Sequence, residues 1–176
     1  MRKITYLLVL LLTFSACKAT KTSKVASKNT QKTQKEIKTK DSSGSDVENS
    51  TINNIIKTAE TYNGVRYKYG GTTKKGMDCS GLITTAYYSE NISLPRTTDD
   101  LATTGSWVDV KEVQKGDLLF FATKKNSRHI NHVGLVTDVR PGFVEFIHST
   151  TSSGVITSKL SDKYWYFAFV QARRIL

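Results

Sequence analysis

The apolar residues of the chain change their spacing once, near Gly105, and this change restricts the fold more than any other feature. Before it, apolar positions recur every three or four residues, which is typical of helices that bury one face. After it, short apolar runs alternate with turn residues, which is typical of strands. Helices followed by consecutive strands predict an α+β domain.

Three helices are expected before this change. The first covers residues 51–62, where four apolar residues recur at helical spacing and Gly64 stands beyond the end. The second covers residues 79–88 and presents its apolar side chains on one side. A third, shorter helix is expected over residues 98–104.

Five strands are expected after the change, because each run is short, apolar and bounded by turn residues. Their ranges are 117–122, 132–139, 143–149, 154–159 and 164–173. Pro141-Gly142 is a tight-turn sequence between the second and third runs, so these two runs are expected to form a hairpin. The sequence thus predicts an antiparallel sheet of about five strands.

Residues 1–16 have the parts of a secretory signal. Met1-Arg2-Lys3 is a positive start, Ile4 to Phe14 is a short apolar stretch, and Ser15-Ala16 are small residues before a cut. Cys17 follows directly, and the segment resembles the lipobox of bacterial lipoproteins, in which the cysteine is acylated. The alternative is an ordinary signal peptide with a cysteine at this position by chance. We expect acylation to hold the protein on a membrane.

Residues 18–50 are expected to form a flexible tether. The segment is rich in Lys, Thr, Ser and Gln and has no aromatic residue, so it cannot bury enough apolar surface to offset the entropy cost of ordering. The predicted organisation is a signal peptide over 1–16, a lipidated cysteine and tether over 17–50, and one folded domain over 51–176.

The net charge of +11 is spread along the chain rather than gathered in one stripe. No dense basic run with interleaved aromatic residues is present, so nucleic acid is not expected as a partner. A mildly cationic surface suits anionic envelope polymers or anionic lipid. The alternative is that the charge serves solubility alone.

Cys79 is the candidate nucleophile. The chain has two cysteines, and if Cys17 is acylated, Cys79 has no partner for a disulfide. Asp78-Cys79-Ser80-Gly81 stands before an apolar helical run, which predicts Cys79 at a helix N-terminus. The helix dipole would favour the thiolate there, and the backbone N–H of Cys79 would be free to bind an oxyanion.

The base must be one of the three histidines. His132 begins one strand of the predicted hairpin and His148 ends the other, so the two can lie near each other. One imidazole could then orient the other through its second ring nitrogen, as in a catalytic triad. His129 lies in a polar loop and is expected to be exposed to solvent.

Five motifs follow one another within residues 51–176. They are Val65-Arg66-Tyr67-Lys68-Tyr69-Gly70-Gly71, Asp78-Cys79-Ser80-Gly81-Leu82, Leu94-Pro95-Arg96-Thr97-Thr98, Lys115-Gly116-Asp117-Leu118 and His132-Val133-Gly134-Leu135. Together they resemble the NlpC family of cell-wall cysteine peptidases. The likeness is greatest to Spr-type murein endopeptidase lipoproteins, with which the chain also shares the segment from His148 to Val155 and the ending Ala172-Arg173-Arg174.

This resemblance implies a papain-like core in which the catalytic helix packs on an antiparallel sheet. It implies Cys79 as the nucleophile, His132 as the base and His148 as the third polar residue. No metal and no organic cofactor are implied.

The resemblance also assigns residues around the nucleophile. Tyr67 matches the tyrosine whose hydroxyl helps the Cys79 amide to hold the oxyanion, and Asp78 and Ser80 match residues that shape the site. Arg96 is open to two interpretations, a partner for a substrate carboxylate or a member of a structural ion pair. Leu101 stands where relatives often carry glutamine, which puts the family's substrate contacts at this position in doubt.

The substrate implied by the resemblance is the stem peptide of peptidoglycan, cut through a thioester. The favoured bond is the D-alanyl to diaminopimelate cross-link. The alternatives are the D-glutamyl to diamino acid bond within one stem, acyl transfer to a lipid or amine by the same Cys-His pair, and a non-catalytic wall-binding role. The implied location is the cell envelope, on the outer membrane facing the periplasm, and a regulatory protein partner is left open.

Overall fold

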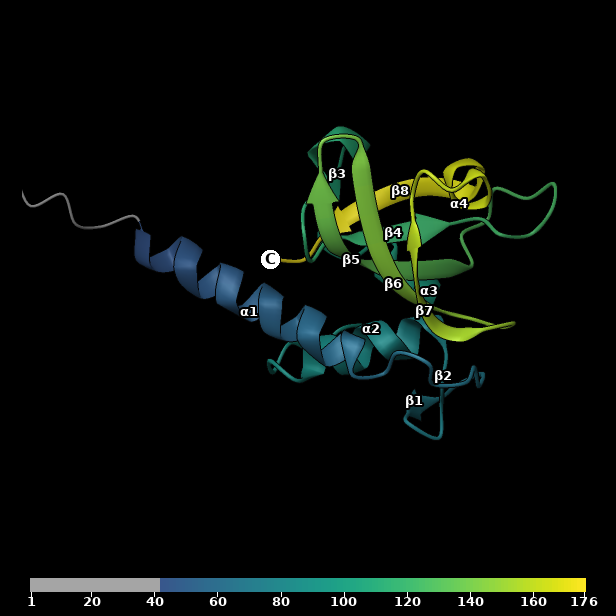
Figure 1. Ribbon diagram of the computed structural model, residues 1–176, viewed down its shortest axis with the longest axis horizontal. Helices are drawn as coiled ribbons and strands as arrows, with labels where there is room; N and C mark the ends of the chain where they lie inside the picture. Colours follow the sequence, from purple (N-terminus) through teal and green to yellow (C-terminus); the bar gives the residue numbers. More distant parts are fainter. Residues whose placement is uncertain (1–41) are drawn as a thin grey trace, which may run out of the picture. The chain divides into compact units, whose positions relative to one another are not determined.

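The computed structural model describes residues 42–176, which build a six-stranded antiparallel sheet with helices against it (Figure 1). The strand order across the sheet is β3 (Ser106–Val108), β8 (Phe169–Arg174), β4 (Leu118–Phe121), β5 (His132–Arg140), β6 (Phe143–Thr150) and β7 (Gly154–Lys159). Every neighbouring pair is antiparallel. The α+β class with an antiparallel sheet is therefore confirmed.

Two helices, α1 (Ser42–Glu60) and α2 (Cys79–Tyr88), pack on one face of this sheet. Several short elements complete the described chain. They are β1 (Thr72–Thr73) and β2 (Gly76–Met77), which pair with each other, the helices α3 (Thr98–Leu101) and α4 (Lys163–Ala168), and the 3-10 turn η1 (Val110–Glu112).

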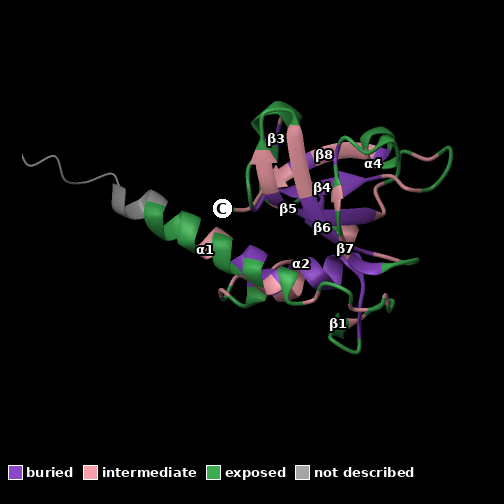
Figure 2. Cartoon of the chain, in the orientation of Figure 1, coloured by how far each residue is buried: buried purple, intermediate pink, exposed green. Residues whose placement is uncertain are grey.

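The side chains of β4 alternate between two core layers. Leu118 and Phe120 belong to the layer under α1 and α2, whereas Leu119 and Phe121 belong to the layer on the other face. All four are fully buried, because both faces of this central strand are covered (Figure 2).

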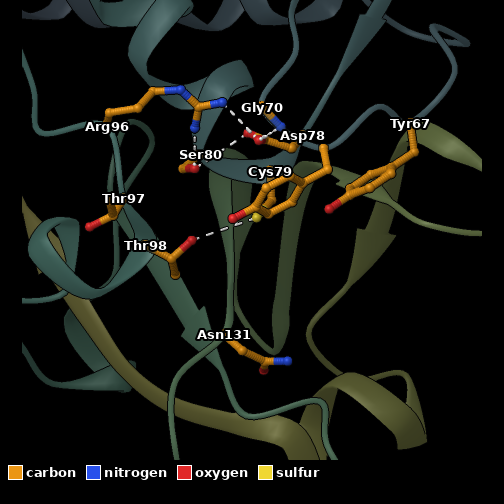
Figure 3. Close-up of a pocket in the computed structure, with 10 residues that line it drawn as sticks. Tyr67, Gly70, Asp78, Cys79, Ser80, Arg96, Thr97, Thr98 and Asn131 are labelled. Atoms are coloured by element: carbon orange, nitrogen blue, oxygen red, sulfur yellow. Dashed lines mark hydrogen bonds and ion pairs between the residues drawn. The ribbon is translucent and has the colours of Figure 1, made fainter.

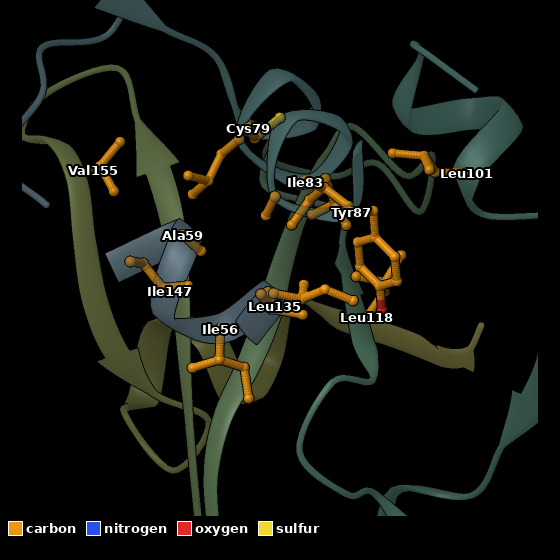
Figure 4. Packing of buried hydrophobic residues seen from close by; sticks show 14 of the residues in the cluster. Ile56, Ala59, Cys79, Ile83, Tyr87, Leu101, Leu118, Leu135, Ile147 and Val155 are labelled. Carbon is orange, nitrogen blue, oxygen red and sulfur yellow. The ribbon is translucent and has the colours of Figure 1, made fainter. Parts of the chain in front are cut away.

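The layer under the helices fixes the position of α2. Its members in Figure 4 include Ile56, Ala59, Ile83, Tyr87, Leu118, Leu135 and Ile147. Burying one such side chain contributes about 1.5–3 kcal/mol, and the Tyr87 hydroxyl also donates to the carbonyl of Gly116 at 2.6 Å. The start of α2 is therefore held against the sheet by several contacts at once.

The helix at 79–88 and the strand at 154–159 have the predicted bounds. The hairpin is confirmed as well, since Arg140 of β5 pairs with Phe143 of β6 around Pro141-Gly142. Gly142 has a φ of 73°, a left-handed conformation that glycine adopts without strain.

The first helix begins at Ser42, so the prediction that residues 42–50 belong to a disordered tether is wrong. Residues 46–50 are exposed, and they extend the helix away from the packed positions Ile55, Ile56 and Ala59. Once the packed part has formed, each further helical residue adds one hydrogen bond at little extra cost, which explains the longer helix.

The prediction of a strand over 164–173 is wrong for its first half, because these residues form α4. Only the second half is extended, as β8. Aromatic residues favour a strand in the sequence, but a helical turn brings Trp165 and Ala168 to the same side, against the sheet. Tyr164, Tyr166 and Phe167 are left exposed. The three-residue strand β3 was not expected, because it is too short to show alternation, and α3 ends before the predicted limit at 104.

The predicted signal peptide over 1–16, the acylation of Cys17 and the rest of the tether lie outside the described residues. Within residues 42–176, no helix combines the length and the apolar character needed to cross a membrane.

Candidate active site

Cys79 is the first residue of α2. Asp78 caps this helix from an extended backbone, and its carboxylate accepts the N–H of Gly81 at 2.7 Å. The first N–H groups of a helix have no partners within it and carry a partial positive charge. The structure thus places the candidate nucleophile at the positive end of α2.

Cys79 is only 8% exposed, and this burial raises the pKa of its thiol because the thiolate would lose hydration. Three groups near the sulfur act in the opposite direction and favour the thiolate. They are the hydroxyl of Thr98, with Oγ1 3.7 Å from Sγ, and the main-chain N–H groups of Val133 and Ser80. Burial is the largest of these effects, so the environment favours the thiol over the thiolate.

His132 and His148 form a pair on neighbouring strands, as the hairpin predicts. Nε2 of His132, at the start of β5, lies 2.9 Å from Nδ1 of His148 in β6. On the far side, His148 Nε2 lies 2.9 Å from Oγ of Ser158 in β7. A hydrogen-bonded chain therefore crosses three adjacent strands and begins at the candidate base.

The direction of the hydrogen bonds from His132 through His148 to Ser158 decides whether His132 can accept a proton. If His148 Nε2 donates to Ser158, its Nδ1 is an acceptor and takes the N–H of His132 Nε2. Nδ1 of His132 then has a free lone pair and can act as a base. In the reverse direction, Ser158 donates to His148 Nε2 and His148 Nδ1 donates to His132 Nε2, so the proton of His132 lies on its Nδ1. His132 could not then act as a base, so catalysis requires Ser158 Oγ as the acceptor.

Both imidazoles are neutral at pH 7. Burial lowers the pKa of His132 to about 4, and burial together with the nearby His132 lowers the pKa of His148 to about 3. Trp165 of α4 contributes to this burial, since its ring stacks on His132 at 5.3 Å and meets His148 edge-on at 4.5 Å. A neutral imidazole is the form that accepts a proton from a thiol.

Two adjoining cavities, of about 330 and 440 Å³, have Tyr67, Cys79 and Asn131 in both their walls. Cys79 therefore lies where the two cavities meet. His132 lines the larger one, so the candidate nucleophile and base face the same cleft. A bound molecule whose reacting atom lies at Cys79 can extend into both cavities.

Tyr67 is half-buried, and its hydroxyl points to the side of the cleft where Cys79 lies (Figure 3). Its main chain forms a bridge with Met77, two residues before the nucleophile. Burial, with the neighbouring Cys79 and Asp78, raises the pKa of Tyr67. The hydroxyl therefore keeps its proton and can donate it in a hydrogen bond to an oxyanion.

Asp78 and Ser80 are buried beside the nucleophile and contact other parts of the chain (Figure 3). The Asp78 carboxylate accepts the N–H groups of Gly70 and Gly81 and pairs with Arg96, each at 2.7 Å. Arg96 also donates to Ser80 Oγ at 2.7 Å. Arg96 is thus part of a structural ion pair, and this network joins three segments around the start of α2.

Sequence patterns single out neither Thr98 nor Ser158. Thr98 stands within a family motif, which is its only signal, and Ser158 lies in a polar strand with none.

Leu101 is fully buried in the core layer under the helices, so its side chain is not available to a substrate. His129 lies on an exposed loop, as expected, and its Nε2 is 3.6 Å from Oδ1 of Asp99. Among the described residues, no three side chains of the metal-binding types gather in one place.

Several proteins of known sequence are similar to this chain. Murein DD-endopeptidase MepS/murein LD-carboxypeptidase of Escherichia coli K12 is 33% identical over 168 residues, which cover 92% of this chain and 86% of that protein. Probable endopeptidase NlpC of the same organism is 38% identical over 117 residues, covering 66% and 73% of the two chains.

Two solved structures are also similar to this chain. An NlpC/P60 family protein from Bacillus cereus superposes with a TM-score of 0.63 and 32% identity, covering 71% of this chain and 40% of the other. A Staphylococcus aureus protein, described as similar to lipoprotein of the NLP/P60 family, gives 0.62 and 29%, covering 82% and 45%. The chain thus spans less than half of either solved chain. The NlpC/P60 family model itself matches residues 64–174. The chain belongs to the NlpC/P60 family.

Proposed function

We propose that this chain is a cysteine endopeptidase that hydrolyses peptide bonds of peptidoglycan. The observation that supports the proposal is that Cys79, at the positive end of α2, and His132, whose Nε2 lies 2.9 Å from Nδ1 of the buried His148, line the same cleft. The relative named murein DD-endopeptidase supports peptidoglycan as the substrate, because the similarity covers 92% of this chain.

The reaction begins when His132 Nδ1 takes the proton of the Cys79 thiol and the sulfur attacks the carbonyl carbon of the substrate. The negative charge that forms on the carbonyl oxygen is held by the Cys79 N–H and the Tyr67 hydroxyl. His132 then gives its proton to the leaving nitrogen as the C–N bond breaks, and a thioester remains on Cys79.

Water completes the cycle. His132 again acts as the base, a water oxygen attacks the thioester carbonyl, and the carboxylate product leaves as the thiol is restored. His148 holds the His132 ring and stabilises the imidazolium through the bond between Nε2 and Nδ1. Asp78 and Ser80 act by holding the start of α2 in place rather than by exchanging protons.

The bond that we propose is the D-alanyl to diaminopimelate cross-link. This choice follows the name of the relative that is similar over nearly the whole chain. A second candidate is the bond from D-glutamate to the diamino acid within one stem. It is favoured by similarity to the gamma-D-glutamyl-L-lysine dipeptidyl-peptidase of Bacillus subtilis, which is 38% identical but matches only 48% of this chain.

We further propose that Cys17 is acylated and anchors the domain to the outer membrane, facing the periplasm. The positive start, the short apolar stretch and the small residues before Cys17 support export and acylation. Labelling of the exported protein with a clickable palmitate analogue tests this, and the Cys17→Ser variant should lose the label.

Digestion of purified diaminopimelate-containing sacculi, followed by mass spectrometry of the products, decides between the two bonds. Cleavage of the cross-link converts dimeric muropeptides into monomers with complete stems. Cleavage after D-glutamate shortens the stems instead, and this outcome would replace the first candidate by the second. Sacculi left intact by the wild-type chain would reject both.

A further inference from the structure

The Thr98 hydroxyl lies beside the candidate nucleophile and is otherwise uncommitted. Its Oγ1 is 3.7 Å from the Cys79 sulfur, a hydrogen-bond distance for sulfur, and Figure 3 shows it pointing to that atom. No other hydrogen bond of this side chain is found among residues 42–176. Thr98 also lines the smaller cavity together with Cys79, so the contact is made within the substrate cleft.

The position of Thr98 is set by contacts that do not involve Cys79. The neighbouring Thr97 caps α3, since its hydroxyl accepts the N–H of Asp100 at 3.2 Å and donates to the Asp100 carboxylate at 2.6 Å. One turn later, Leu101 is fully buried in the core layer under the helices. The main chain at Thr98 is therefore held in place before the sulfur ionises, so α3 need not rearrange for the hydroxyl to stabilise a charge there.

The contact has two opposite consequences, depending on which atom donates. A thiol that donates to Thr98 Oγ1 would be stabilised in its protonated form, whereas a hydroxyl that donates to the sulfur stabilises the thiolate. The catalytic step sends the thiol proton to His132, and the charge then develops on the sulfur of a residue that is only 8% exposed. A thiolate has no proton to give, so at that stage only the hydroxyl can donate.

We propose that Thr98 donates its hydroxyl proton to the Cys79 sulfur and stabilises the thiolate that attacks the substrate. The inference rests on the proposed function only in taking Cys79 as the nucleophile. Thr98 would thus be a member of the catalytic site, supplied by α3. The main-chain N–H groups of Ser80 and Val133, which also favour the thiolate, would act beside it.

The test is the pH dependence of Cys79 alkylation by iodoacetamide in the full-length chain, measured by mass spectrometry of the peptide that contains Cys79. This measurement distinguishes alkylation of Cys79 from alkylation of Cys17, and it needs no peptidoglycan. The isosteric Thr98→Val variant should raise the midpoint of the alkylation profile by about half to one pH unit, because one donor to the thiolate is lost. Below the midpoint, the rate should fall about 3- to 10-fold.

Two matched variants separate this effect from a structural one. Thr98→Ser keeps the hydroxyl and should keep a midpoint near that of the wild type. Thr97→Val removes the cap of α3 without touching the sulfur, so any loosening of α3 should show in this variant as well. If Thr98→Val does not fold, Thr98→Ala is measured in its place against the same expectation.

An unchanged or lowered midpoint in Thr98→Val would overturn the proposal, and so would an equal rise in Thr97→Val. A lowered midpoint would mean that the thiol is the donor. Because alkylation reports on the sulfur alone, a chain that fails to cut peptidoglycan but shows the expected shifts would reject the proposed function and keep the inference about Thr98.

Discussion

Single residues outside the cleft control the protonation state of the reacting residues. Ser158 is the clearest case, because its Oγ lies 2.9 Å from His148 Nε2, and the proposed reaction requires it to accept a hydrogen bond there so that His132 Nδ1 stays unprotonated. Without that acceptor, His148 can carry its proton on Nδ1 and donate it to His132, which removes the base. The hydroxyl of Ser158 therefore affects the reaction although it does not contact the thiol.

We expect Ser158→Ala to lower the rate of muropeptide hydrolysis by about 10-fold, by analogy with the loss seen when the hydrogen-bond partner of a metal-binding histidine is removed. Ser158→Thr keeps the hydroxyl and should retain most of the activity. Thr157→Ala, at the exposed neighbouring position, serves as the control. Activity of Ser158→Ala equal to that of the control would show that the hydroxyl has no part in orienting His148.

At the scale of secondary-structure elements, the start of α2 is joined to the rest of the chain through Asp78. Its carboxylate caps the helix, accepts the N–H of Gly70 and pairs with Arg96, which approaches from the segment before α3. One side chain thus holds together the loop that carries Tyr67, the helix that carries Cys79 and the segment that carries Thr98. The cleft depends on this junction for its shape.

We expect Asp78→Ala to lower the free energy of unfolding by about 1–3 kcal/mol, since a helix cap is lost and buried N–H groups are left without a partner. Urea denaturation measures this change. Asp109→Ala is the matched control, because Asp109 caps only the exposed turn η1, through the N–H of Lys111. A loss in Asp78→Ala no larger than in the control would contradict the role given to this junction.

The elements predicted correctly are those with a strong local signal. The hairpin of β5 and β6 is marked by Pro141-Gly142, and α2 by a capping residue followed by an apolar face. In contrast, α4 forms because Trp165 packs across the sheet, which local sequence does not reveal. The same holds for the site, where Cys79 and the histidines stand in recognisable motifs but Ser158 joins them only through strand pairing.

At the scale of the whole molecule, two buried neutral histidines couple the stability of the fold to pH. In the unfolded chain a histidine has a pKa of about 6.5, whereas in the folded chain the values are about 4 for His132 and about 3 for His148. Below pH 6.5 the unfolded state therefore binds more protons than the folded state. The contribution of the neutral pair to the free energy of unfolding is therefore complete above pH 6.5. It is lost as the pH falls toward about 4 for His132 and about 3 for His148.

We expect the melting temperature to fall between pH 7.5 and pH 5.5, a range chosen because most carboxylates do not titrate in it. Each buried histidine lowers the free energy of unfolding by as much as about 1.4 kcal/mol per pH unit below 6.5. His148→Gln removes one of these groups and should show a shallower dependence on pH. A melting temperature that is constant across this range, or equal slopes for the two proteins, would contradict the buried neutral pair.

The most direct test of the whole account is the hydrolysis of a purified cross-linked muropeptide dimer by the wild-type chain and by Cys79→Ala, followed by mass spectrometry. The account predicts that the wild type releases monomers. It predicts that Cys79→Ala, with an unchanged circular dichroism spectrum and thermal transition, releases none. Undiminished release of monomers by a folded Cys79→Ala variant would contradict the account, because the bond would then be cut without the sulfur.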